Sequence, residues 1–433
     1  MAKRSSRKRA ETQRFRRTRR RSAALLLAFC VTFGVTLSIL LGALLRACAP
    51  RLPVDPMVTT DLPRNPPLAG PLRTPTEPIE PQRVEVVRWW DAVVTNTLPP
   101  PLLTAGTAAP TRPKTTAGAP TVTRPSLTAW QPLLAAEGLD VSVCPPAELR
   151  NYLDSHPVTA SLQYEQSPSV RAPYAAGRLT DRSQQAAVNA LNAIRLVAGV
   201  PPNVRASDDL VTTAQYAAVL LAKNGKLSHT PGQPADMPSA FYQRALRGTK
   251  GGNLAHTVGS TNVLLNDLRQ FLDDSDSHNI STMGHRRWML NPGMGATGFG
   301  HADVFTVMMA TDRSNASAGA KHRVVAFPAQ MTPTAYFSPD WAWTVSLDEG
   351  FDISGVSVLL VRRSDGRQWF FAASGSDGDF FRSNAATGQP RCVIFRPKGA
   401  SVRAEDTYYV EVSGIRKGGK DYPLRYYVNF YAL

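Results

Sequence analysis

An uncharged run of 24 residues, 22–45, places the strongest limit on how this chain can be arranged. As a helix with a rise of about 1.5 Å per residue it extends about 36 Å, enough to cross a hydrocarbon core of ~30 Å. Residues 1–21 hold eleven Lys or Arg and one Glu, so they carry +10 of the chain's net charge of +16. Basic residues beside a membrane span stay in the cytoplasm. The sequence therefore predicts a basic cytoplasmic tail (1–21), one transmembrane helix (22–45) and an extracytoplasmic remainder.

A cleaved signal peptide is the alternative interpretation of this run. The apolar part of a signal peptide usually has roughly 7–15 residues, and the run here is longer. Pro50 follows the small-residue triplet at 47–49, which disfavours cleavage. We therefore expect a single-pass protein of the cell membrane. The tail serves as an orientation signal or also binds anionic lipid headgroups. No nucleic-acid partner is expected, because this cytoplasmic tail has Phe15 as its only aromatic residue.

Proline dominates the next part of the chain. Between Pro50 and Pro125 lie 17 of the chain's 35 prolines, both ends included. Such sequence stays extended and solvated, because it cannot close a packed core. We predict a disordered Pro-rich stalk over residues 46–127 and an ordered lead-in segment over 128–174. A short apolar segment, 84–97, interrupts the stalk and either lies on the membrane or docks onto the folded part.

Apolar residues recur at helical spacing in three later segments. The predicted helices cover about 182–198, 208–224 and 261–274. Ser207 or Asp208 is expected to cap the second helix, and Ser260 or Thr261 the third. Between the last two helices the sequence predicts a long loop.

Strand patterns follow the third helix. Residues 296–301 and 304–311 are predicted strands, with Gly298 and Gly300 allowing close approach of neighbouring backbone. Beyond residue 320 the helical period disappears, and alternating patterns indicate short strands joined by turns. These later strands are expected at about 356–362, 367–373, 392–395, 407–415 and 425–432. The sequence thus predicts an α+β chain with a mixed domain over 175–319 and a small antiparallel β-sandwich over 320–433.

Two cysteines, Cys144 and Cys392, lie in the predicted folded exterior. An extracytoplasmic location permits a disulfide between them. A buried free thiol is an equally common outcome for a cysteine, so both alternatives stay open. The chain has no Cys-x-x-Cys pair, which argues against a thiolate zinc site.

Two histidine motifs stand about fifty residues apart, Leu227-Ser228-His229-Thr230 and Gly284-His285-Arg286-Arg287. With Leu290-Asn291-Pro292 and the order of predicted elements, they resemble the CAP superfamily, which comprises cysteine-rich secretory proteins, antigen 5 and pathogenesis-related 1 and is also called the SCP domain. The resemblance covers about residues 180–315 and is closest to a bacterial form in which a β domain follows. It implies an α-β-α sandwich for the first domain.

The resemblance also implies a cleft surrounded by two histidines and two glutamates, which in much of the family can hold a divalent metal. His229 and His285 match the histidines, whereas Gly252 stands where the first glutamate belongs. Asp274 corresponds most nearly to the second glutamate. The candidate cleft residues are His229, Asn253, Asp274, His285 and Arg286. His229, His285 and Asp274 form a candidate site for a metal such as zinc; alternatively, both histidines are hydrogen-bonded residues of a polar cleft.

Neighbouring residues of the second histidine motif have structural interpretations. Arg286 or Arg287 is expected to pair with an acid among residues 273–276, and Trp288 to pack in the core. Ser228 adjoins His229, but sequence neighbours seldom form a nucleophile–base pair.

The leading functional hypothesis is a surface-anchored binding or interaction module rather than an enzyme. Its ligand would be a lipid, an envelope component or a protein. The alternatives are an extracytoplasmic hydrolase that acts on peptides or cell-wall material, and a structural envelope protein.

Overall fold

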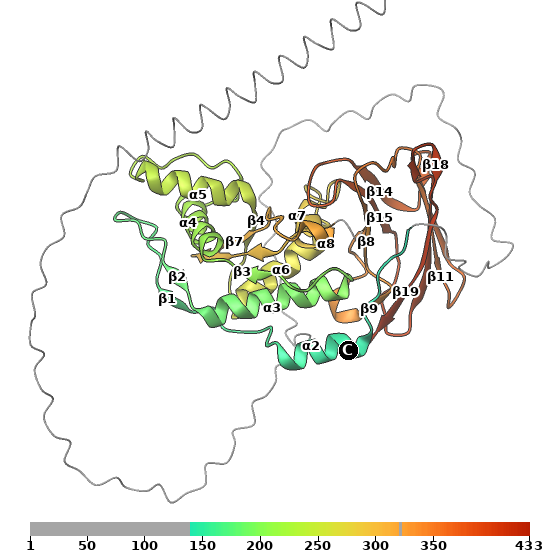
Figure 1. The fold of residues 1–433 in the computed structure, drawn as a ribbon, viewed down its shortest axis with the longest axis horizontal. Helices are drawn as coiled ribbons and strands as arrows, with labels where there is room; N and C mark the ends of the chain where they lie inside the picture. Colours follow the sequence, from blue (N-terminus) through green and yellow to red (C-terminus); the bar gives the residue numbers. More distant parts are fainter. Residues whose placement is uncertain (1–138, 320–322) are drawn as a thin grey trace, which may run out of the picture. The chain divides into compact units, whose positions relative to one another are not determined.

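The computed structural model describes residues 139–319 and 323–433 (Figure 1). The predicted tail, transmembrane helix and stalk, and the first residues of the lead-in segment, lie outside these ranges. No helix within the described ranges is both long and apolar enough to cross a membrane. The described chain contains helices and many strands, which confirms the α+β class.

The first half of the described chain alternates helices with short strands. Its helices are α2 (Pro146–Ser155), α3 (Asp181–Val197), α4 (Asp208–Asn224), α5 (Ser239–Gly251), α6 (Val263–Asp273), α7 (Gly284–Met289) and α8 (Ala316–Gly319). Its strands are β1 (Tyr164–Gln166), β2 (Arg178–Leu179), β3 (Arg205–Ala206), β4 (Gly252–His256), β5 (Ala296–Thr297), β6 (Phe299–Ala302) and β7 (Phe305–Met309).

The three helices predicted from periodicity are α3, α4 and α6, each within two residues of its expected ends. Their caps differ from expectation. Ser207 occupies the N-cap of α4 without a capping hydrogen bond from its side chain. Asn262 occupies the N-cap of α6, and the Ser260 hydroxyl instead accepts the Asn262 N–H at 3.1 Å.

Helix α5 lies where the sequence predicted a loop, so that prediction was wrong. The helix buries few apolar side chains, and its last turn is rich in glycine, which conceals the helical pattern. Gly248 has a packing role, because an added Cβ would lie 2.6 Å from the Ala217 Cβ of α4. The absent side chain lets α4 and α5 approach closely.

A three-stranded antiparallel sheet, in the order β4-β7-β6, lies between two groups of helices. Leu254 and its partner Val307 belong to an apolar cluster with α4 and α5. Ala255 and Met308 belong to a second cluster with α3 and α6. Because neighbouring strand residues point to opposite faces, the two clusters cover opposite faces of the sheet.

The predicted close approach at Gly298 and Gly300 is confirmed. An added Cβ at Gly298 would collide with the backbone of Leu210 and Val211. At Gly300 it would collide with the backbone of Ala214. Strand β6 therefore lies directly against α4.

The second half of the described chain forms two further sheets. The four-stranded sheet, in the order β14-β15-β10-β8, contains β8 (Val324–Phe327), β10 (Trp343–Leu347), β14 (Gly378–Ser383) and β15 (Arg391–Pro397). The six-stranded sheet, in the order β13-β12-β11-β16-β19-β9, contains β9 (Met331–Pro333), β11 (Ser357–Arg362), β12 (Gln368–Ala372), β13 (Gly375–Ser376), β16 (Thr407–Ser413) and β19 (Leu424–Tyr431). A 3-10 turn, η2 (Thr334–Tyr336), and the pair β17 (Arg416–Lys417) and β18 (Lys420–Asp421) complete this half.

Aromatic side chains join these two sheets. The ring of Trp343 on β10 lies 5.5 Å from that of Tyr408 on β16 and 6.1 Å from that of Phe430 on β19. All strand pairs in the two sheets are antiparallel except β9 with β19. The five strands predicted in this region are present as β11, β12, β15, β16 and β19.

One hydrophobic core extends through both halves of the described chain. It contains Leu268 and Phe271 of α6 together with Trp343 of β10. The lead-in segment joins the same core, and the Gln330 side chain donates a hydrogen bond to the Val141 carbonyl.

Cys144 and Cys392 are both free and buried in the structure, so of the two alternatives the disulfide is not formed. Cys144 precedes α2, where burial raises the pKa of its thiol to about 11. Cys392 lies in β15, with its sulfur 3.5 Å from the Ser346 hydroxyl. The two thiols thus occupy separate surroundings, and the buried-thiol alternative applies to each.

Candidate functional site

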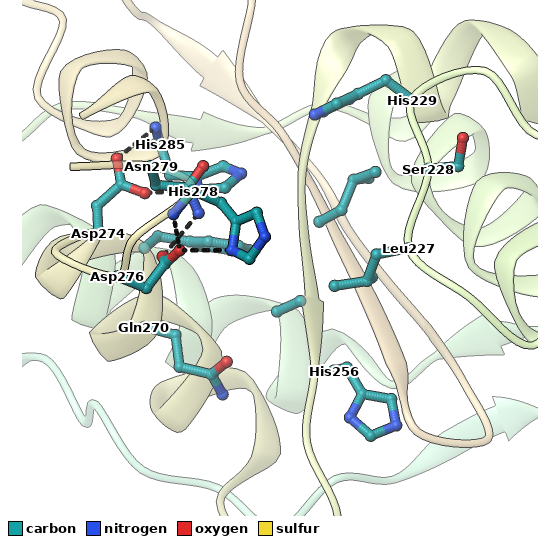
Figure 2. Close-up of a pocket in the computed structure, with 13 residues that line it drawn as sticks. Leu227, Ser228, His229, His256, Gln270, Asp274, Asp276, His278, Asn279 and His285 are labelled. Atoms are coloured by element: carbon teal, nitrogen blue, oxygen red, sulfur yellow. Dashed lines mark hydrogen bonds and ion pairs between the residues drawn. The ribbon is translucent and has the colours of Figure 1, made fainter. Parts of the chain in front are cut away.

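Two adjoining pockets form a cleft, and Figure 2 shows the larger of them. The larger has a volume of about 550 Å³ and the smaller about 210 Å³. His229, Asn279 and His285 line both pockets, so they mark the junction. The structure therefore brings the two sequence-predicted histidines to one site.

His229 lies on the loop that follows α4. Gly225 ends that helix in the left-handed region, with φ of 66°. The Nδ1 atom of His229 lies 2.7 Å from the Thr249 carbonyl oxygen, and the Thr249 hydroxyl donates to the His229 carbonyl at 3.1 Å. Since a carbonyl oxygen only accepts, Nδ1 carries the proton and Nε2 of the neutral ring is an acceptor.

His285 lies in the first turn of α7, on the opposite side of the cleft (Figure 2). One oxygen of Asp274 lies 2.8 Å from Nδ1 of His285. The other accepts the backbone N–H groups of His285 at 2.9 Å and Arg286 at 3.3 Å. A carboxylate accepts only, so His285 also carries a proton on Nδ1, and in the neutral form of the ring Nε2 is an acceptor.

His229, His285 and Asp274, the candidate metal ligands, are not grouped as three ligands of one ion. Asp274 uses both carboxylate oxygens to hold α7, so it orients His285 instead of standing beside it as a ligand. Across residues 139–319 and 323–433, no group of three or more His, Cys, Asp or Glu side chains could hold a metal ion. The glutamate missing at Gly252 also has a structural reason, because an added Cβ would lie 2.7 Å from a Val307 methyl carbon.

Arg286 does not belong to the cleft, contrary to expectation. Its side chain is buried and donates to the carbonyl oxygens of Leu272, Asp273 and Ala342. The predicted carboxylate partner is therefore replaced by backbone carbonyls at the end of α6 and just before β10. Burial lowers the pKa of Arg286 to about 10.

Arg287 makes the corresponding link to the loop between β14 and β15. Its guanidinium donates to the carbonyl oxygens of Thr282, Ala385 and Gln389, and to the Ser383 hydroxyl. Arg286 thus links α7 to the residue before β10, and Arg287 links α7 to the loop between β14 and β15.

Two residues that line the smaller pocket were not predicted as site residues: Trp288 and Thr387. Trp288, expected in the core, is half-buried and lines this pocket, with the Arg313 guanidinium 5.5 Å from its ring. Thr387 lines the same pocket from the second half of the chain. Asn253 matches its prediction, since it lines the pocket and donates to the His285 carbonyl at 3.0 Å. No local pattern points to Thr387, because only the tertiary fold brings it here.

The larger pocket is lined by both apolar and polar side chains. Leu227, Leu254 and Phe271 supply apolar surface, and Leu227 is 46% exposed. Asp276 and His278 supply polar groups. Burial opposes ionisation of Asp276, but hydrogen bonds from Asn279 and from backbone N–H groups outweigh it and hold the pKa of Asp276 below its usual value. The cleft therefore suits a ligand with both apolar and polar parts.

Ser228 is not arranged as a nucleophile activated by His229. Its hydroxyl accepts the Thr230 N–H at 3.1 Å, while Nδ1 of His229 is engaged by Thr249. Figure 2 shows Ser228 and His229 on the same side of the cavity, opposite Asp274 and His285.

Comparison with protein-family models and with curated proteins gives no match for this chain. Its function is therefore inferred from the residues of the cleft.

Proposed function

We propose that this protein is a membrane-anchored binding protein whose ligand occupies the cleft between His229 and His285. The observation that carries the proposal is the matched state of the two imidazoles. Each has its Nδ1 proton held by an acceptor on its own wall, Thr249 or Asp274. In its neutral form each ring offers Nε2 as an acceptor, so a ligand with hydrogen-bond donors can bridge the walls.

We further propose that residues 175–319 form a CAP-type domain. Helices α4 and α5 cover one face of the β4-β7-β6 sheet, and helices α3 and α6 cover the other. This layering supports an α-β-α sandwich. The meeting of the two histidines in one cleft supports the same assignment. The later two-sheet part corresponds to the β domain of the bacterial form.

The proposed location rests on the sequence before residue 46. An uncharged run preceded by a strongly basic tail places the cleft outside the cytoplasm, on an anchor at residues 22–45. A cleft on a membrane-anchored protein can bind an envelope component or a neighbouring protein.

A binding role fits the cleft better than hydrolysis. A hydrolase needs a nucleophile beside a base, or a water held for attack. Ser228 turns its hydroxyl to the Thr230 amide, and Asp274 is occupied by α7. The Ser228 hydroxyl and the Asp274 carboxylate therefore bond to backbone groups of the protein, and not to a catalytic partner.

The proposal is tested with the full chain, purified in detergent without chelator. Three probes are applied: a random decapeptide library, vesicles of phosphatidylethanolamine and phosphatidylglycerol, and soluble peptidoglycan fragments. We expect one class to bind, with affinity at least about tenfold lower for His229→Ala and His285→Ala. His156→Ala, at the C-cap of α2, is the matched control and should bind like the wild type. Binding of no class, or binding that both cleft variants leave unchanged, would overturn the proposal.

A further inference from the structure

Strand β4 is the edge of the β4-β7-β6 sheet and, among the described residues, pairs only with β7. At its two ends, the Ala310 N–H donates to the Gly251 carbonyl and the Thr257 N–H donates to the Val304 carbonyl. In an antiparallel pair the residues that bond to the partner strand alternate with residues that face away. Gly251, Asn253, Ala255 and Thr257 therefore bond to β7, whereas Gly252, Leu254 and His256 turn their backbone groups outward.

The outward backbone groups of Leu254 and His256 are unpaired. Within residues 139–319 and 323–433, neither their N–H groups nor their carbonyl oxygens have a hydrogen-bond partner. A row of unpaired groups on an edge strand is a template for another strand. Proteins usually cover such an edge or blunt it with charge, and β4 carries neither Lys nor Arg nor Pro.

The unpaired edge of β4 runs along the cleft, where residues 252–255 are buried and His256 is exposed. Leu254 faces the α4 and α5 cluster, while Ala255 faces the α6 cluster, and both line the larger pocket. Gly252 and Asn253, also consecutive, line the smaller pocket. Consecutive strand residues point to opposite faces of the sheet. A cleft lined by residues 252–255 in succession must therefore run along the edge of the sheet, where both faces can be reached. Its walls are then the two helical layers that carry His229 and His285.

The two ends of this edge differ in charge. Lys250 precedes β4 and lines the smaller pocket. Asp276 lines the larger pocket, as does His256 at the other end of the strand. The side chain of Asp276 is 54% exposed. The cleft thus offers an ammonium group where β4 begins and a carboxylate beside the part where β4 ends.

We propose that the cleft binds an extended peptide segment that pairs with the edge of β4 as a fourth strand of the sheet. This inference rests on the proposed binding function and names its ligand class. At a rise of about 3.3 Å per residue, the five residues of β4 pair with about five residues of the peptide. An apolar side chain of the peptide packs on Leu227 and Phe271 in the larger pocket.

Charge sets the direction of the peptide. In an antiparallel arrangement its amino end lies near Asp276 and its carboxyl end near Lys250. The parallel arrangement would place like charges together at both ends, which disfavours it. The preferred peptide therefore has a free amino group or a basic side chain at the end near Asp276, and a carboxylate at the end near Lys250.

Backbone methylation of the peptide is the direct test. The tightest binder from the decapeptide library is prepared with a single N-methyl group at each position in turn, and each dissociation constant is measured against the full chain. Strand addition predicts losses of at least about tenfold at alternate positions and little change between them. Recognition through side chains alone predicts no period of two, and that result would overturn strand addition.

A matched pair of variants tests the same hydrogen bonds from the protein side. His256→Pro removes one outward N–H at a position where an edge strand tolerates proline, and His256→Ala keeps that N–H. We expect His256→Pro to bind the peptide at least about tenfold more weakly than His256→Ala. If His256→Pro melts below the wild type, the methylation series alone decides the question.

Lys250→Glu tests the direction. It should weaken binding of a peptide with a free carboxyl end and have less effect on the same peptide as a C-terminal amide. An equal loss for both forms would overturn the antiparallel arrangement. Should vesicles or peptidoglycan fragments bind with dependence on His229 and His285 while no peptide does, this inference fails and the binding function stands. Should no probe bind, both fail.

Discussion

Asp274 holds His285 with both of its carboxylate oxygens. One lies 2.8 Å from Nδ1 of the ring, and the other accepts the His285 N–H at 2.9 Å. The Asp274 side chain is fully buried, whereas that of His285 is 21% exposed. A single buried carboxylate therefore fixes the position of α7 and the protonated nitrogen of its histidine.

Asp274→Ala is expected to release His285 from one tautomer. The Nδ1 proton loses its acceptor, so nitrogen-15 NMR of the imidazole should show both neutral tautomers in place of one. Two backbone N–H groups also lose their partner, which should lower the free energy of unfolding by about 1–3 kcal/mol. Asp276→Asn is the control, because that residue lines the cleft without contacting His285. Unchanged His285 spectra in Asp274→Ala would contradict the assignment.

Arg287→Ala is expected to destabilise the whole described unit. Four acceptors around the guanidinium lose their donor, and the side chain is buried. Removal of a buried, multiply bonded charge costs about 3–5 kcal/mol, measured by urea unfolding. Arg182→Ala, at an exposed position of α3, should change stability by less than about 0.5 kcal/mol. Equal effects of the two substitutions would rule out the fastening role.

Asp267 makes stability depend on pH. Burial raises the pKa of its carboxyl to about 6, despite a hydrogen bond from Thr257. The folded pKa exceeds the unfolded value of about 3.9, so folding disfavours ionisation, and stability is lost as pH rises from about 4 to about 6. Asp267→Asn cannot ionise, and its stability relative to the wild type should rise by about 2 kcal/mol between pH 4 and pH 7, because the unfolded-state carboxyl is already about half ionised at pH 4. Asp154→Asn, at an exposed position of α2, serves as control. Parallel pH profiles for wild type and Asp267→Asn would refute the shift.

Gly300→Ala should prevent the close contact between β6 and α4. The new Cβ would collide with the α4 backbone, which cannot move aside as a flexible side chain can. We expect a loss of about 3 kcal/mol or more in thermal or urea unfolding. Gly375→Ala, where an added Cβ meets nothing within 4 Å, should have little effect. A wild-type melting temperature for Gly300→Ala would show that the helix is not packed as described.

The sequence alone identified the elements whose apolar residues repeat regularly. Helices α3, α4 and α6 carry apolar residues at helical spacing that are buried in the structure, and β11, β16 and β19 alternate or run apolar between turn residues. It also indicated both histidines and Asn253, because these stand in short motifs. Helix α5 escaped prediction, since its buried face has few apolar side chains, Phe241 and Ala245, beside Gly248 and Thr249.

Tertiary structure alone decided what the residues beside the histidines do. Asp274 matched a position of a metal-binding pattern, yet the left-handed turn at its backbone brings its carboxylate onto the first turn of α7. Arg286 and Arg287 follow the expected acidic partners at 273–276 by ten to fourteen residues, but their guanidinium groups reach carbonyls that lie up to about a hundred residues away. Periodicity reports which face of an element is buried, whereas a buried polar group takes the partner that the whole fold places within hydrogen-bonding distance.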